Sequence, residues 1–293
     1  MRSTSSNSNK NLRKRPAWLR ALGNAEPPSS VQVEGNTYQL QSIFKHDSWA
    51  ATALYADASG ARITCKFNRM QPVFVIPMQW LGRTLARREA HFLRLLRDVP
   101  LVPDDLGPVV AKGLVLQNAL ARRYVDGAPF RDDTIVDARF FEQLRSLLDA
   151  VHRHDMAYVD MHKRENIIID LQGQPHLIDF QVSYSPGRRW PWNGRFAHYV
   201  LRQLQQMDDY NYRKHYARCL KHLLSAAEYR RLLQPTGLVR WHRKVGVPLR
   251  TLRRRLLTSL HLRDRSGQAS SELEPEDAFR KPGAEKDRPY NRG

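Results

Sequence analysis

One segment constrains the fold of this chain more than any other, because it sets polar side chains around two short apolar runs. It reads YVDMHKRENIIIDLQGQPHLIDFQ and spans residues 158–181. The apolar runs, 167–169 and 176–178, flank an Asp-Leu-Gln-Gly turn signal, and this pattern predicts a β-hairpin. Since the open ends of a hairpin lie side by side, we expect Asn166 and Asp179 to converge there.

These polar groups suit a particular chemistry. An amide oxygen of Asn166 and a carboxylate of Asp179 form a hard-oxygen site that suits Mg²⁺, with phosphate and water completing the coordination. Asp160, one loop away, can accept a proton from an attacking hydroxyl. Metal ligands and an acid that orients the nucleophile are the parts that phosphoryl transfer requires. The alternative interpretation, that the three are only caps and turn formers, leaves their order and spacing unexplained.

The rest of the sequence predicts an α+β, two-lobed fold. Alternating and short apolar runs predict a β-rich first half with one helix at 84–97, whose apolar residues form a stripe. A break at 126–129 precedes a mainly helical second half that opens with a strongly amphipathic helix at 138–154. The predicted strands of the first half are 31–33, 38–44, 51–55, 62–67, 112–116 and 119–125.

The segment 158–181 resembles the catalytic loop and metal-binding hairpin of the protein-kinase-like superfamily. Asp160 stands where that family has its catalytic Asp, Asn166 where it has its metal-binding Asn, and Asp179-Phe180 where it has Asp-Phe-Gly. The sequence is most similar to bacterial lipopolysaccharide-core (Kdo/heptose) kinases and to RIO-like and aminoglycoside-phosphotransferase-like kinases. The resemblance covers roughly residues 31–262 and implies ATP as substrate and Mg²⁺ as cofactor.

The first half supplies further residues in the order of that family. Thr64 and Lys66 share one face of a strand, as do the family's small residue and its phosphate-binding Lys. Glu89 is the only carboxylate in the following helix and is the natural partner of Lys66. Residues 123–127 fall where the hinge to the second lobe would hold adenine. The resemblance thus implies ATP-binding roles for Thr64, Lys66 and Glu89.

The sequence also departs from the family pattern. No glycine-rich loop is present, and the turn 44–49 stands in its place, so Ser48 and nearby backbone are the groups expected to cover phosphates. The loop after Asp160 is one residue longer than usual, which leaves open whether His162 or Lys163 fills the family's Lys position. Gln181 replaces the Gly of Asp-Phe-Gly. These departures motivate an alternative hypothesis, a pseudokinase or nucleotide-binding scaffold.

Composition divides the chain and excludes several classes of protein. Residues 1–28 are expected to be a flexible basic arm, 29–126 the first lobe, 127–262 the second lobe with a basic helical end, and 263–293 a disordered tail. No run approaches the roughly 18–20 apolar residues of a membrane span. Two cysteines among 293 residues form neither a disulfide framework nor a zinc motif. A polar N-terminus without a signal peptide favours a cytoplasmic location.

Positive charge is concentrated in the second half. The chain has 48 Lys and Arg against 29 Asp and Glu, a net charge of +19. Residues 182–262 alone carry 17 basic and 3 acidic residues. Three interpretations stay open: solvated helix faces, peripheral contact with an anionic membrane or lipopolysaccharide surface at the inner face of the membrane, or nucleic-acid binding. Trp190 and Trp192 among arginines, with the basic amphipathic stretch 247–260, favour the second.

Together these observations predict an ATP- and Mg²⁺-dependent kinase that phosphorylates a hydroxyl group. The expected acceptor is anionic, either a lipopolysaccharide-core sugar of a glycolipid or a Ser/Thr of a protein. A RIO-like kinase associated with nucleic acid is the remaining alternative, and it predicts RNA binding that weakens steeply with salt.

Overall fold

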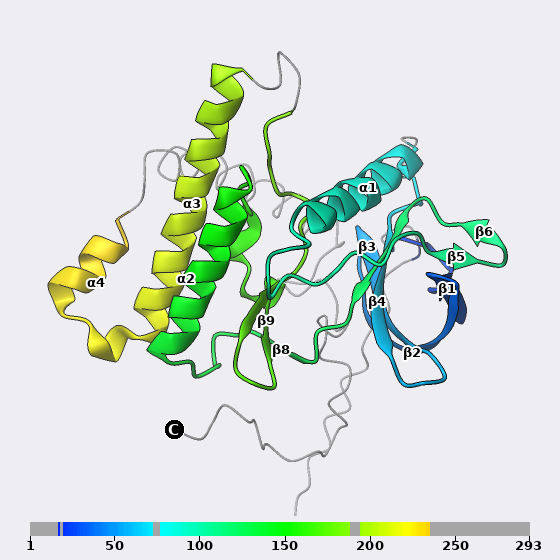
Figure 1. Cartoon of the computed structure of the whole chain (residues 1–293), viewed down its shortest axis with the longest axis horizontal. Coiled ribbons are helices and arrows are strands. Elements are labelled where there is room, and N and C mark those ends of the chain that lie inside the picture. Colours follow the sequence, from blue (N-terminus) through cyan, green and yellow to red (C-terminus); the bar gives the residue numbers. More distant parts are fainter. Residues whose placement is uncertain (1–16, 18–19, 73–76, 188–193, 235–293) are drawn as a thin grey trace, which may run out of the picture.

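The computed structural model describes residues 17, 20–72, 77–187 and 194–234 (Figure 1). The expected disordered tail, the basic stretch 247–260 and the segment that contains Trp190 and Trp192 lie outside the described residues. Residues 1–16, 18 and 19 of the expected basic arm lie outside them as well.

A seven-stranded antiparallel sheet forms the first lobe, in the order β6-β5-β1-β2-β3-β4-β7. Figure 1 shows that this sheet curls around itself on one side of the molecule. Its apolar face buries a continuous cluster of side chains from β1 to β7, including Ala53, Cys65 and Ala121. The strands are β1 (Ser30–Val33), β2 (Asn36–His46), β3 (Ala50–Ala56), β4 (Arg62–Asn68), β5 (Val110–Ala111), β6 (Leu114–Val115) and β7 (Ala119–Arg123).

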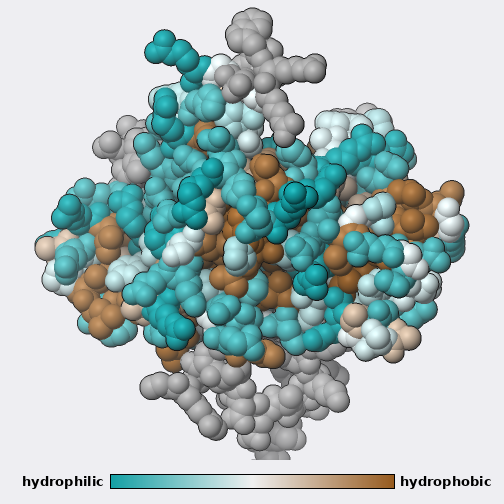
Figure 2. All heavy atoms as spheres, in the orientation of Figure 1, coloured by the Kyte–Doolittle hydropathy of each residue, from teal (hydrophilic) through white to brown (hydrophobic). Residues whose placement is uncertain are grey.

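The single strand predicted at 112–116 is wrong, because the chain turns back on itself within it. β5 and β6 pair as a tight hairpin in which Val110 lies opposite Val115. The turn residues Lys112 and Gly113 have φ values of 52° and 75°. A two-residue turn with both φ values positive matches the twist of paired strands. Leu114 and Val115 of this edge hairpin are exposed, and Figure 2 shows apolar surface in this region.

One helix, α1 (Gln79–Leu95), packs on the face of the sheet that turns toward the second lobe (Figure 1). It begins five residues before the predicted residue 84. Its first turn lacks a side-chain cap that would mark the start of the helix in the sequence. Gly82 lies inside this first part of the helix and faces the backbone at Arg69. The first turn is therefore held by its packing against the end of β4 and not by a side-chain cap.

Three residues connect the two lobes. β7 ends at Arg123, and β8 (Gly127–Pro129) already belongs to a second sheet, of order β10-β9-β8. The predicted break at 126–129 is therefore largely a strand. The predicted hairpin is confirmed as β9 (Ile167–Asp170) and β10 (Pro175–Leu177), with Ile167 opposite Leu177. Asp170 closes the turn by accepting hydrogen bonds from the backbone N–H groups of Gln172 and Gln174.

The second lobe is otherwise helical. α2 (Ala138–Arg153) begins at Asp137, whose side chain accepts a hydrogen bond from the N–H of Phe140. α2 lies beside α3 (Arg195–Cys219), and the short α4 (Ala226–Leu232) follows (Figure 1). The main core lies between α2, the small sheet and α1. The predicted α+β, two-lobed fold is confirmed, and no helix in the described part of the chain is long and apolar enough to cross a membrane.

The end of the expected basic arm is seated against the large sheet. Ala21 is fully buried, and its N–H donates to the carbonyl of Asp47 at 2.8 Å. Arg20 pairs with Glu26 at 2.7 Å, and both contact the ring of His46 at the end of β2. These contacts hold residues 20–26 against the end of β2 and the β2–β3 turn.

Candidate functional site

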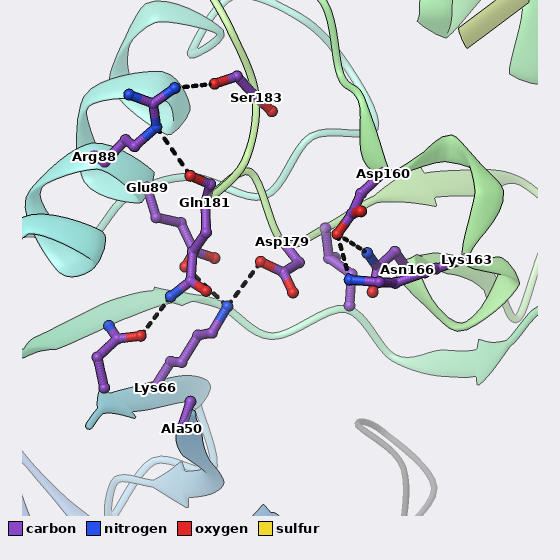
Figure 3. A network of polar contacts seen from close by, with 12 residues as sticks. Ala50, Lys66, Arg88, Glu89, Asp160, Lys163, Asn166, Asp179, Gln181 and Ser183 are labelled. Carbon is purple, nitrogen blue, oxygen red and sulfur yellow. Dashed lines mark hydrogen bonds and ion pairs between the residues drawn. The ribbon is translucent and has the colours of Figure 1, made fainter. Parts of the chain in front are cut away.

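Lys66 lies at the centre of the polar network between the two lobes (Figure 3). Its Nζ donates to Oε2 of Glu89 at 3.0 Å and to Oδ1 of Asp179 at 2.8 Å. Lys66 comes from β4, Glu89 from α1, and Asp179 follows β10. The predicted pair of Lys66 and Glu89 is present, and the structure adds Asp179 to it.

The charges of this trio depend on burial and on one another. Burial by itself lowers the pKa of Lys66, but Asp179 and Glu89 more than offset it, and the net pKa is raised. Burial would raise the pKa of Asp179, but the ammonium of Lys66 holds the net pKa below its ordinary value. Glu89 is 1% exposed, and its burial raises its pKa even though Lys66 opposes this. Lys66 and Asp179 are thus charged at neutral pH.

Asp160 and Asn166 meet across one turn of the loop that precedes β9. Asn166 Nδ2 donates to Asp160 Oδ2 at 3.3 Å, so the amide oxygen of Asn166 is left for another partner. Lys163 Nζ donates to the same carboxylate oxygen at 2.6 Å, whereas Nδ1 of His162 is 3.6 Å from Oδ1. Of the two candidates for the family's Lys position, Lys163 is the one at hydrogen-bond distance from Asp160.

A buried carboxylate on α3 holds the backbone ahead of Asp160. Asp208 is fully buried and accepts hydrogen bonds from the N–H groups of Tyr158 at 2.7 Å and Val159 at 2.8 Å. Val159 has φ of 71°, which is unfavourable for a β-branched residue. Asp208, with His152 at 3.3 Å on its other side, stabilises this backbone and so fixes where Asp160 points.

Thr64 lies two residues before Lys66 on β4 and directly opposite Arg122 of β7. Its hydroxyl oxygen is buried and has no hydrogen-bond partner in the described part of the chain. Most buried hydroxyls are paired, because an unpaired one loses its hydrogen bonds to water without replacement. The unpaired hydroxyl fits a position that a ligand completes.

The turn between β2 and β3 contains Ser48 but is closed by its own side chains. Asp47 Oδ1 accepts hydrogen bonds from the N–H groups of Trp49 at 2.7 Å and Ala50 at 3.0 Å. The carbonyl of Ser48 accepts from Arg69 at 2.6 Å. The backbone N–H groups near Ser48, expected to cover phosphates, are therefore engaged within the turn.

The oxygen donors of the site fit Mg²⁺. Asn166 and Asp179 flank the two strands at the open end of the hairpin and offer an amide and a carboxylate oxygen. The N–H of Ile178 donates to the carbonyl of Asn166 there at 3.0 Å. In the described part of the chain no cluster of three or more His, Cys, Asp or Glu could hold a metal ion. Mg²⁺ commonly takes one or two protein carboxylates and fills its octahedron with phosphate oxygens and water, so one carboxylate and one amide oxygen fit it.

Sequence reasoning missed Asp208 and the contacts of Gln181. A signal for Asp208 existed, because Asp208 and Asp209 are two of only three acids among the basic residues of 182–262. For Gln181 the sequence showed only a substitution. Its partners, Asn68 and Arg88, lie about a hundred residues away along the chain and could not be read from spacing.

Comparison with known proteins gives distant structural similarity alone. No protein-family model and no curated protein matches the sequence. A solved structure of the Rio2 kinase from Chaetomium thermophilum, an ADP/Mg²⁺-phosphoaspartate complex, is 17% identical with a TM-score of 0.46, over 71% of this chain and 65% of that one. Another structure of that Rio2 kinase is 17% identical with a TM-score of 0.45, over 71% and 68% of the two chains. The chain thus spans just under two thirds of the first of these structures.

Proposed function

We propose that this chain is an ATP- and Mg²⁺-dependent phosphotransferase that phosphorylates a hydroxyl group. The observation that carries the proposal is the position of Lys66, held at 3.0 Å by Glu89 and at 2.8 Å by Asp179. A lysine fixed between two carboxylates, one of them at the opposite strand end of the hairpin from Asn166, provides a cation for phosphates in the same region as oxygen ligands for a metal.

Each residue of the site has a distinct role in this proposal. Lys66 contacts phosphate oxygens of the nucleotide, and Glu89 keeps its side chain directed there. Asp160 orients the acceptor hydroxyl and receives its proton, while Lys163, 2.6 Å from Asp160, offsets negative charge at the transferring phosphate. Asn166 and Asp179 would hold Mg²⁺, which supplies positive charge at the phosphate oxygens when bound. Thr64 contributes its hydroxyl to the nucleotide pocket.

The acceptor that we favour is a sugar hydroxyl of an anionic glycolipid, with a protein Ser/Thr as the alternative. The support is the net charge of +19 and its concentration in residues 182–262. A basic surface concentrates anionic substrates and favours peripheral contact with an anionic membrane. Phosphotransfer to a panel of acceptors, with neutral and anionic glycolipids beside protein substrates, distinguishes the two classes.

A thermal-shift titration with Mg-ATP tests the nucleotide site. At about 100-fold excess over Kd, binding adds about 2.7 kcal/mol, or about 5–10 °C for a folded region of this size. We expect this shift in the wild type and in Asp98→Ala, which removes an exposed carboxylate remote from Lys66, and its loss in Asp179→Ala. Absence of any shift in the wild type at millimolar Mg-ATP would refute the proposal.

A second candidate function, a nucleotide-binding scaffold without transfer, is favoured by the closed β2–β3 turn. The carboxylate of Asp47 takes the two N–H groups that could otherwise contact phosphates. ATP turnover separates the candidates. An active kinase loses turnover in Asp160→Ala while keeping its Mg-ATP thermal shift. A scaffold binds Mg-ATP but shows no turnover that depends on Asp160.

A further inference from the structure

Gln181 ties the segment after Asp179 to both elements that carry the Lys66 site. Its backbone N–H hydrogen-bonds the carboxylate of Asp179. Its side-chain Nε2 donates to Oδ1 of Asn68 at the end of β4, and its carbonyl accepts from Nε of Arg88 at 3.0 Å. Figure 3 shows the side chain of Gln181 running alongside Glu89 toward β4. One residue therefore uses its N–H, its carbonyl and its side chain to hold this position.

The receiving amide, Asn68, is itself fixed. Asn68 is fully buried, and its Nδ2 donates to the carbonyl of Asn118 at 3.3 Å. Asn118 returns a hydrogen bond from its own Nδ2 to the carbonyl of Asn68 at 2.8 Å. With its nitrogen engaged in this way, Asn68 presents its oxygen to Gln181. Because Asn68 lies two residues beyond Lys66 on the same strand, Gln181 and Lys66 are held by one rigid element.

Arg88 provides the second attachment and is the neighbour of Glu89 on α1. Its Nη2 donates to the carbonyl of Ser183, and its Nε to that of Gln181 at 3.0 Å. The guanidinium also lies over the ring of Phe92 at 5.2 Å, which restricts its orientation. Consecutive residues of α1 thus contact Lys66 and the segment 181–183, so the helix and this segment move together.

The backbone of Asp179 shows why such attachments matter. Its φ is 62°, in the left-handed region that residues other than glycine rarely occupy. An unfavourable backbone conformation persists only when several contacts of the surrounding structure hold it in place. Lys66 holds the carboxylate of Asp179, and Gln181 with Arg88 holds the chain that follows.

We propose that Gln181 and Arg88 are positioning residues that keep Asp179 and Glu89 on Lys66 before any nucleotide binds. The consequence for catalysis rests on the proposed function, whereas the consequence for the structure does not. A site assembled in this way needs no separate event, such as modification of the chain, to bring α1 and Asp179 to Lys66.

Hydrogen exchange of the ligand-free full chain tests the structural part. Gln181→Met keeps the length of the side chain but removes its donor, and Gln172→Met at an exposed position is the matched control. Loss of one hydrogen bond, here a partly buried one, weakens the attached state about fivefold. We therefore expect exchange in residues 179–184 to rise about fivefold in Gln181→Met alone, with α2 unchanged. Equal exchange in the two variants would overturn the proposal.

A second pair of variants covers the case in which Gln181→Met loosens the whole chain. Arg88→Ala removes the contacts to 181 and 183, while Arg87→Ala removes a neighbouring arginine that contacts Gln117 at 3.2 Å. Faster exchange of 179–184 in Arg88→Ala than in Arg87→Ala supports the proposal. The same exchange in both contradicts it.

Nucleotide binding tests the functional part. If fewer molecules are assembled, the apparent Kd for Mg-ATP rises as the assembled fraction falls, by at most about fivefold for Gln181→Met. Saturating Mg-ATP should restore the exchange protection of 179–184, which a purely structural defect would not allow. If the wild type binds no Mg-ATP, the proposed function fails while the exchange result stands. If Mg-ATP binds but does not restore the exchange protection of 179–184 in Gln181→Met, the positioning role fails.

Discussion

The charge state of single buried side chains decides the local geometry around Asp160, and His215 is the clearest case. Its Nε2 donates to the carbonyl of Met161 at 2.8 Å, and its Nδ1 accepts from Nε of Arg164 at 3.2 Å. The second contact requires a neutral ring, because a protonated Nδ1 could not accept a hydrogen bond. Burial, with Arg164, Lys214 and Arg218 nearby, lowers the pKa of His215 to about 4. The residue after Asp160 is therefore held by a histidine that cannot accept a second proton without losing a partner.

Stability should consequently fall as the solution is acidified from pH 7 to pH 5. The unfolded chain binds a proton on His215 near its ordinary pKa of 6.5, while the folded chain binds it only near 4. Below 6.5 the unfolded state therefore gains protons that the native state does not, and about 2 kcal/mol should be lost by pH 5. Urea denaturation at the two pH values measures this loss.

The control for that experiment is His215→Gln, which can still donate to Met161. It should flatten the pH dependence between 7 and 5 by about 2 kcal/mol. The same variant of His91, an exposed histidine of α1, should leave the dependence as in the wild type. An identical slope in wild type and His215→Gln would contradict the assignment of a lowered pKa.

At the scale of the element, the approach of α1 to β4 decides whether Glu89 reaches Lys66. Gly82 allows this approach: a Cβ built at this position would lie 2.2 Å from the carbonyl oxygen of Arg69. Seven residues later, Glu89 lies on the buried face of the same helix. Gly82 thus sets the distance between α1 and β4, and this distance allows Glu89, two turns along the helix, to pair with Lys66.

Gly82→Ala should destabilise the chain despite the better helix propensity of alanine. Propensity favours Ala by about 1 kcal/mol, but the backbone carbonyl of Arg69 cannot move aside as a flexible side chain would. We expect a net loss of about 1–3 kcal/mol of unfolding free energy, measured in urea, and weaker Mg-ATP binding. Arg83→Ala, on the exposed face, should change neither. A stabilised Gly82→Ala would show that α1 can shift without penalty.

At the scale of the whole molecule, the two lobes are joined through a tight crossing at the start of the second sheet. Gly127 lies opposite Asp170, and a Cβ here would lie 2.2 Å from the carbonyl oxygen of Ile169. The lobes also meet through the core that α1 shares with α2 and the small sheet, and through polar contacts such as Lys66 with Asp179 and Arg88 with the carbonyl of Ser183. The crossing at Gly127 therefore sets how the hinge residues 124–126 enter the second lobe.

Gly127→Ala should lower stability by more than a glycine replacement that meets open space. Gly173 has φ of 80° and no atom within 4 Å of an added Cβ, so Gly173→Ala pays only for backbone strain, about 1–2 kcal/mol. Gly127→Ala instead meets a steric clash with the backbone, of about 1–3 kcal/mol, and should also weaken Mg-ATP binding. Thermal unfolding of both variants, with and without Mg-ATP, makes the comparison. If Mg-ATP raises the unfolding temperature equally in both variants, the packing at Gly127 does not affect the nucleotide site.

The sequence alone determined the elements whose information is local. The hairpin from Asn166 to Asp179 was predictable because its apolar runs and its turn are neighbours in the chain. The pairing of Lys66 with Glu89 was expected from the family resemblance, and the two-lobed fold from the change from period-2 to helical patterns. The hairpin at 110–115 was missed because a single Lys-Gly pair marks its turn.

Only the tertiary structure decided which distant groups share a hydrogen bond. Asp208 reaches the backbone of Tyr158 across 50 residues, and Gln181 reaches Asn68 across 113. Such contacts depend on the angle between elements and on side-chain direction, neither of which is encoded in spacing along the chain. For the same reason the sequence did not show which of Lys163 and His162 lies nearer Asp160. Both follow Asp160 within three residues, and only the folded loop shows that Lys163 is the nearer. Local order specified the parts of the site, and packing between the lobes specified their partners.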